Sequence, residues 1–187
     1  MSPPLRPFQG RGTISLALAF ALMATSCATT ASPPPLSPHA SRQPIALTLP
    51  LLRGGQFNLK AWRGEVVVIT IFATWSLRAQ AEGPRFKQLA ARFRPRNLQI
   101  VAIAIDRNER SLVKTYVDFV GFRFPVALAD PEDLHLVGAL GLTRRVPRTL
   151  LIDRTGRIRQ DHRAGQTDFP RLIRGIETCL AEARPTH

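Results

Sequence analysis

Two dense apolar runs, at 66–72 (VVVITIF) and 99–105 (QIVAIAI), limit what this chain can fold into. Both are rich in β-branched residues and leave no polar face, which is typical of strands covered on both sides of a sheet. Between them, apolar residues of the segment 77–93 recur at i, i+3, i+4 and i+7, which predicts an amphipathic helix. This order of elements predicts a central parallel or mixed sheet with helices packed on it.

The alternation of strands and helices continues to the carboxyl end. The further expected elements are a helix over 109–120, a strand over 125–128, a short helix over 134–140, a strand over 149–152, a turn at 153–156, a returning strand over 157–162 and a helix over 169–183. Cys179 lies on the apolar stripe of that last helix. Because a buried cysteine behaves as a small hydrophobe, we interpret Cys179 as a core residue and not a catalytic one.

The first 27 residues have the pattern of an export signal. Arg6 and Arg11 precede an apolar stretch at 13–25 that is too short to span a bilayer comfortably. The following Cys27 is similar to the lipidated cysteine of a bacterial lipobox, although Ala24 stands where leucine is usual. Cleavage as an ordinary signal peptide is the alternative. We expect an exported, periplasm-facing lipoprotein, and Ala28 after the cysteine favours the outer membrane over the inner one.

The segment 28–44 holds five prolines and no apolar periodicity, so we expect a tether. The remaining residues, 45–187, are expected to form one domain. Exported proteins normally pair their cysteines, yet the chain contains only Cys27 and Cys179. If Cys27 carries lipid, Cys179 has no partner within the chain, and a dithiol mechanism is excluded.

Basic residues outnumber acidic ones by 26 to 13. Without Arg6 and Arg11 the balance is 24 to 13, a net charge of 24 − 13 = +11. Such a charge fits either a solvated basic surface or an anionic partner. We expect no nucleic-acid partner, no metal and no cofactor.

The segment 72–84 reads FATWSLRAQAEGP. It resembles the active-site run of TlpA/ResA-like thioredoxins, approximately F-W-A-T-W-C-x-x-C-x-x-E-x-P. The segment 141–153 reads GLTRRVPRTLLID and resembles the family's G-V-x-G-V-P-T-T-F-L-I-D. The resemblance covers 45–187. It implies a thioredoxin-like three-layer α/β fold, in which a central mixed sheet is flanked by helices, with a TlpA-type insertion around 109–130.

The sequence departs from this family at the two active-site cysteines, whose positions hold Ser76 and Ala79. Thiol–disulfide exchange requires attack by a thiolate and release of a mixed disulfide, and neither residue supplies a thiol. Ser76 could act as a nucleophile only with a neighbouring base, and no histidine of the chain sits in a recognisable motif. We therefore interpret Ser76 as the N-cap of the helix that follows.

Other positions match the family's groove. Pro147 resembles its cis-proline, with a trans loop proline as the alternative. Trp75 resembles a residue that packs beside the site, although a core tryptophan is nearly as well supported. Glu82 matches an acidic residue that assists proton transfer in active relatives. Pro84 is expected to kink the helix, because its ring removes one intrahelical hydrogen bond.

Arginines surround the predicted groove, which consists of Trp75, Ser76, Arg78, Ala79, Glu82 and Pro147. Arg78 lies within the former C-x-x-C interval, and Arg144, Arg145 and Arg148 flank the proline. In the resembling fold these two segments face each other, so the four guanidinium groups are candidates for binding carboxylates or phosphates. Solvated surface charge is the alternative.

Three functions remain open at this point. The first is a redox-inactive binding or assembly module of the cell envelope, whose partner is an envelope protein or an acidic peptide and which reaches the membrane through its lipid anchor. The second is a thiol–disulfide oxidoreductase or peroxiredoxin-like enzyme, which the missing cysteines disfavour. The third is a protein that uses another surface and has a degraded groove.

Overall fold

The computed structural model describes residues 44–106, 109–129, 146–163 and 166–183. The predicted signal peptide, the lipobox and all of the predicted tether except Pro44 lie outside these ranges, as do the predicted helix at 134–140 and both Arg144 and Arg145. Within the described residues, no helix is long and apolar enough to cross a membrane.

The predicted central mixed sheet is present. In spatial order its strands are β5 (Val126–Leu128), β4 (Leu98–Ala104), β3 (Val66–Phe72), β6 (Arg148–Ile152) and β7 (Ile158–His162). Strands β3, β4 and β5 run parallel, whereas β6 is antiparallel to β3 and β7 is antiparallel to β6. All seven residues of β3 are buried, because β3 lies in the middle of the sheet and both of its faces are covered.

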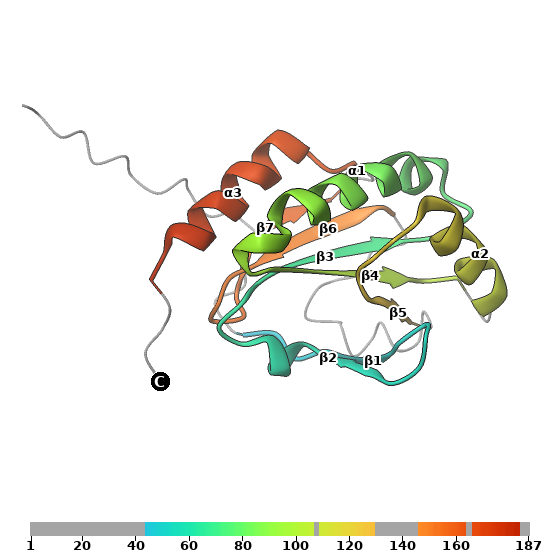
Figure 1. The fold of residues 1–187 in the computed structure, drawn as a ribbon, viewed down its shortest axis with the longest axis horizontal. Coiled ribbons are helices and arrows are strands. Elements are labelled where there is room, and N and C mark those ends of the chain that lie inside the picture. Colours follow the sequence, from blue (N-terminus) through green and yellow to red (C-terminus); the bar gives the residue numbers. More distant parts are fainter. Residues whose placement is uncertain (1–43, 107–108, 130–145, 164–165, 184–187) are drawn as a thin grey trace, which may run out of the picture. The chain divides into compact units, whose positions relative to one another are not determined.

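Three helices cover one face of this sheet (Figure 1): α1 (Leu77–Phe93), α2 (Arg110–Val120) and α3 (Phe169–Ala181). A short 3-10 helix, η2 (Arg94–Arg96), follows α1. Phe86 and Phe93 of α1 pack with Leu172 and Ile176 of α3 over the even-numbered side chains of β3. Cys179 belongs to the same buried cluster, which confirms it as a core residue.

The opposite face is covered by a hairpin that the sequence did not predict. Its strands β1 (Thr48–Pro50) and β2 (Gln56–Asn58) have three residues each, and the 3-10 helix η1 (Leu59–Trp62) follows. Leu49 and Phe57 bury their side chains against Ile69 and Leu150 of the sheet. Such short strands carry too few alternating residues to be read from sequence alone.

Helix α2 and strand β5 occupy the segment expected for the insertion, 109–130. Val113 and Val117 of α2 pack with Phe72 and Val126, so the insertion extends the helical layer beyond α1. Because β3 and β4 are parallel neighbours, α1 and α2 both begin at the same edge of the sheet. This edge carries the candidate site.

Candidate functional site

Ser76 is the N-cap of α1, as its sequence context predicted. Its Oγ accepts the backbone N–H of Ala79 at 3.4 Å and donates to the carbonyl oxygen of Val146 at 3.3 Å. The hydroxyl therefore joins the start of α1 to the loop that leads into β6. Both of its partners are backbone groups, and none of the described side chains is hydrogen-bonded to it as a base.

The loop before Ser76 is fixed by a buried carboxylate. Asp106, at the end of β4, accepts hydrogen bonds from the backbone N–H and the hydroxyl of Thr74, at 2.9 Å and 2.5 Å. The Nε2 of Gln80 donates to the carbonyl oxygen of Thr74 at 2.5 Å. These contacts hold the loop in one conformation against the two parallel strands.

The side chains on either side of Ser76 are exposed. Trp75 is 65% exposed and Leu77 is 80% exposed, so the interpretation of Trp75 as a core tryptophan is wrong. Arg78 is exposed as well, and it makes no hydrogen bond or ion pair with the described part of the chain. Ala79, by contrast, is buried beneath them. The site therefore presents an indole, a leucine and a guanidinium to solvent.

Pro147 follows a cis peptide bond from Val146, as its resemblance to the family's cis-proline implied. Both residues are buried beside the Ser76 loop. The two segments that carry the family resemblance are thus brought together in the fold.

The prediction that Arg148 lines the groove is wrong. Its side chain is 2% exposed, and its Nε and NH2 groups donate to the two carboxylate oxygens of Asp161 at 2.9 Å and 2.7 Å. Arg163 also donates to Asp161. Burial alone would raise the pKa of Asp161, but the hydrogen bonds from both arginines hold that pKa below its ordinary value. Arg148 is neutralised inside the protein and cannot attract an anion from solvent.

Glu82 is buried one turn beyond Ala79. Its two carboxylate oxygens accept the backbone N–H of Thr167 at 2.6 Å and the Thr167 hydroxyl at 2.7 Å. The Thr167 hydroxyl also lies 2.8 Å from that of Thr149 in β6. Glu82 thereby links α1 to the segment that precedes α3, and both of its carboxylate oxygens are engaged there.

Pro84 lies inside α1, which continues through it as one helix. Because proline has no N–H, the carbonyl of Gln80 loses its intrahelical donor. The hydroxyl of Tyr116 in α2 lies 3.4 Å from this carbonyl and donates to it. A Cβ atom on Gly83 would overlap the same hydroxyl oxygen, so Gly83 makes room for Tyr116. Burial raises the pKa of Tyr116 to about 12.

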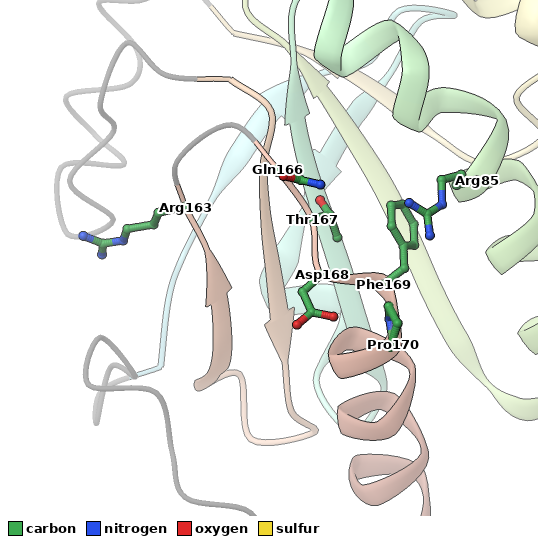
Figure 2. A pocket seen from close by; sticks show the side chains of 7 residues that line it. All are labelled: Arg85, Arg163, Gln166, Thr167, Asp168, Phe169 and Pro170. Atoms are coloured by element: carbon green, nitrogen blue, oxygen red, sulfur yellow. The ribbon is translucent and has the colours of Figure 1, made fainter.

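A pocket of about 550 Å³ adjoins the segment held by Glu82 (Figure 2). Its lining residues are Arg85, Arg163, Gln166, Thr167, Asp168, Phe169 and Pro170. The Arg85 guanidinium stacks over the Phe169 ring, 3.9 Å from its centroid. Figure 2 shows Arg163 on the opposite side, pointing away from Arg85. Asp168 caps α3 by accepting the N–H of Arg171, so its carboxylate already occupies that helix terminus.

His162 lies next to Asp168, which lines this pocket, and its burial favours the neutral imidazole. Its Nδ1 accepts the N–H of Asp168 at 3.3 Å, and its Nε2 lies 3.0 Å from Oε1 of Gln160, to which it donates. Burial, with the nearby charge of Arg171, lowers the pKa of His162. Both ring nitrogens of His162 therefore have structural hydrogen-bond partners, and neither partner is Ser76.

The described residues of this site include no thiol. Within the described ranges the only cysteine is Cys179, whose burial raises the pKa of its thiol to about 12. The same ranges contain no cluster of three His, Cys, Asp or Glu side chains suited to a metal ion. The arrangement presents an exposed, partly apolar surface beside a buried proline.

Sequence reasoning missed three polar residues that build the site: Thr74, Asp106 and Thr167. A signal existed for the first two, because they follow neighbouring strands whose carboxyl ends meet at one edge of the sheet. Thr167 carried no such signal, since its role depends on the buried Glu82 of a distant helix.

Comparison with known proteins agrees with this geometry. Residues 41–161 match the sequence model of the AhpC/TSA family. The chain is 28% identical over 131 residues to the thiol-disulfide oxidoreductase ResA of Halalkalibacterium halodurans, a match that covers 70% of this chain and 72% of that protein. It is 27% identical over 107 residues to ResA of Bacillus anthracis, covering 57% of this chain and 60% of that protein.

Solved structures share the fold. A putative thiol:disulfide interchange protein DsbE from Chlorobium tepidum superposes with a TM-score of 0.67 at 23% identity, covering 79% of this chain and 100% of the other. A putative thioredoxin from Neisseria meningitidis superposes with a TM-score of 0.64 at 26% identity, covering 73% and 88%. These likenesses establish a thioredoxin-like architecture.

Proposed function

The chain belongs to the AhpC/TSA family, among its TlpA/ResA-like, thioredoxin-fold members, and on this premise we propose that it is a redox-inactive binding module of the bacterial cell envelope. The observation that carries the proposal is Ser76, which occupies the position of the family's nucleophilic cysteine. Its hydroxyl is engaged by the N–H of Ala79 and the carbonyl of Val146.

The lost chemistry follows from these two positions. In the family, the first cysteine attacks as a thiolate stabilised by the helix N-terminus. A serine hydroxyl has no comparable acidity and forms no disulfide. Ala79 removes the resolving thiol that would release a mixed disulfide. The alternative, an active oxidoreductase or peroxiredoxin-like enzyme, would require a cysteine that this site does not contain.

The binding face has features that a recognition site requires. Trp75 and Leu77 are exposed on either side of the helix-capping Ser76, and exposed aromatic side chains are common anchors of interfaces. Asp106 and Gln80 hold the loop that carries them. A face that is already ordered loses less conformational entropy when a partner binds.

Arg78 indicates the chemistry of the partner. It lies one residue beyond Leu77, is exposed, and forms no ion pair with the described residues. We propose that it contacts a carboxylate of an envelope protein or acidic peptide whose apolar residues cover Trp75 and Leu77. Arg144 and Arg145 remain candidates for the same role and lie outside the described residues, whereas Arg148 has no part in it.

We further propose that the protein is exported, is anchored through Cys27 and faces the periplasm, at the outer membrane in preference to the inner one. This placement rests on the amino-terminal sequence pattern and on Ala28 following the cysteine. The proline-rich segment 28–44 would then act as the tether.

Partner capture from intact envelopes tests the proposal. Chemical crosslinking of the full chain should retain a specific protein that the Trp75→Ala, Leu77→Ala variant loses. A control is Lys60→Gln, Arg157→Gln, which changes two exposed side chains outside this face. Arg78→Gln should weaken capture and reduce its sensitivity to salt. Equal recovery of the same protein with the Trp75 and Leu77 variant would refute this binding face.

A further inference from the structure

A second exposed apolar surface lies on α2, outside the candidate site. Leu112 is 48% exposed and Phe119 is 89% exposed. They are seven residues apart, so they lie on the same flank of the helix, two turns from each other. Val113 and Val117 bury the opposite flank against the sheet. Burial of α2 is thus complete without Leu112 and Phe119, and nothing in the packing of the described residues requires a large apolar side chain at either position.

The charges around this flank are predominantly positive. Lys87 lies beside the end of α2 and donates to the carbonyl of Val120 at 3.1 Å. Arg123 is also exposed. Asp118 of α2 is already contacted by both Lys114 and Arg53 at 2.7 Å. Lys87 and Arg123 therefore leave a positive charge at the Phe119 end of α2, whereas the exposed carboxylate of Glu109 lies at the other end of the helix, one turn before Leu112.

We propose that this surface, formed by Leu112, Phe119, Lys87 and Arg123 and hereafter called the α2 surface, docks on anionic lipid headgroups. Phenylalanine and leucine insert at the boundary between headgroups and acyl chains, and flanking lysines and arginines contact lipid phosphates. The inference does not rest on the proposed function, because it uses none of the residues that carry that function.

The polar groups of α2 permit this contact. The Thr115 hydroxyl, which lies between Leu112 and Phe119, donates to the carbonyl of Ser111 at 3.0 Å. The Asp118 carboxylate is neutralised by its two cations. At the Phe119 end of the helix, contact with lipid therefore leaves neither this hydroxyl without an acceptor nor Asp118 without a cation, either of which would oppose transfer to a lipid surface.

The shape of the surface favours lipid over a protein partner. Protein hot spots sit in well-packed pockets, whereas Phe119 protrudes from a helix with most of its ring in solvent. Aromatic packing of Tyr116 with Phe72 and Phe122 holds α2 on the body of the domain. The surface is therefore presented as a rigid, convex, cationic face.

Hydroxyl-radical footprinting of the full chain tests the proposal at unmodified residues. The chain is reconstituted in vesicles of phosphatidylcholine alone and in vesicles with an equal part of phosphatidylglycerol. Oxidation of Phe119 and Leu112 should fall several-fold in the anionic vesicles only. Trp62, which is partly exposed in η1 and belongs to the layer on the opposite face of the sheet, is the internal control and should be oxidised equally in both.

Two double variants test whether the positive charge of the α2 surface is needed for protection. Lys87→Gln, Arg123→Gln should weaken the protected state by about fivefold for each cation removed. Lys60→Gln, Arg157→Gln removes the same charge elsewhere on the exposed surface and should leave protection unchanged. Equal oxidation of Phe119 in both vesicle types would overturn the proposal. Protection that appears only after envelope proteins are added would overturn it too, since the α2 surface would then bind protein.

Discussion

Arg148 and Asp161 form a bidentate ion pair between the adjacent strands β6 and β7, and both side chains are almost completely buried. We expect Asp161→Asn to lower the free energy of unfolding by about 3 kcal/mol, because it leaves a buried guanidinium without its counter-charge. Urea denaturation measures this loss. The double variant Arg148→Met, Asp161→Leu should recover most of it. A change below about 0.5 kcal/mol in Asp161→Asn would show that the pair is not needed for stability.

The purified chain should not reduce disulfides. Ser76 and Ala79 supply no thiol, and Cys179 is buried with its pKa raised to about 12. Insulin turbidity assays should therefore match the rate of the reductant alone. Turnover close to that of a ResA protein measured in parallel would contradict the proposed function. Ser76→Cys, Ala79→Cys tests whether the scaffold supports exchange once both thiols are supplied.

Stability should decline as the pH falls below about 6.5, the ordinary pKa of histidine. Burial lowers the pKa of His162 in the folded state, so the unfolded chain takes up the proton first. Protonation would also place an N–H at Nδ1, facing the N–H of Asp168. The contribution is complete above pH 6.5 and is lost as the pH falls towards the folded-state pKa. His162→Gln should flatten this part of the urea midpoint profile, and an unchanged slope would count against the assignment.

Gly83→Ala should destabilise the domain, although alanine is the better helix former by about 1 kcal/mol. The new methyl group would overlap the Tyr116 hydroxyl oxygen and force α1 and α2 apart. Overpacking of this kind costs about 1–3 kcal/mol. In a Tyr116→Phe background the clash is relieved, so the same substitution should become neutral or stabilising. A thermal melt of the four proteins completes this double-mutant cycle.

Metabolic labelling with a fatty acid should mark the chain in its native host. Cys27→Ala should abolish the label, because that cysteine is the predicted acceptor. Cys179→Ala is the matched control and should remain labelled, since Cys179 is buried in α3. Unlabelled, freely soluble wild-type protein would indicate cleavage as an ordinary signal peptide.

The sequence predicted those parts of the fold whose pattern is long and periodic. Strand β3 and helix α1 were predicted with the bounds that the structure has, and β4 was displaced by one residue. The hairpin of β1 and β2 was missed, because three-residue strands show no usable alternation.

The site was predictable only where a role depends on local sequence. Ser76 could be identified as an N-cap from the helix that follows it. The exposure of Arg148 was predicted wrongly, because an arginine next to a groove proline is expected to be solvated. Its burial depends on Asp161, a residue on the neighbouring strand, and no local pattern pairs the two.

The hydrogen bonds of Ser76 to Ala79 and Val146 have a consequence for how the site responds to its surroundings. A cysteine pair at this position exists in oxidised and reduced forms, and its contacts change with the electron supply of the compartment. A serine hydroxyl has one form at every potential. The junction between α1 and the Pro147 loop is therefore the same whether the surroundings are oxidising or reducing. If the face beside it binds a partner as proposed, its occupancy is set by concentration and affinity and not by redox state.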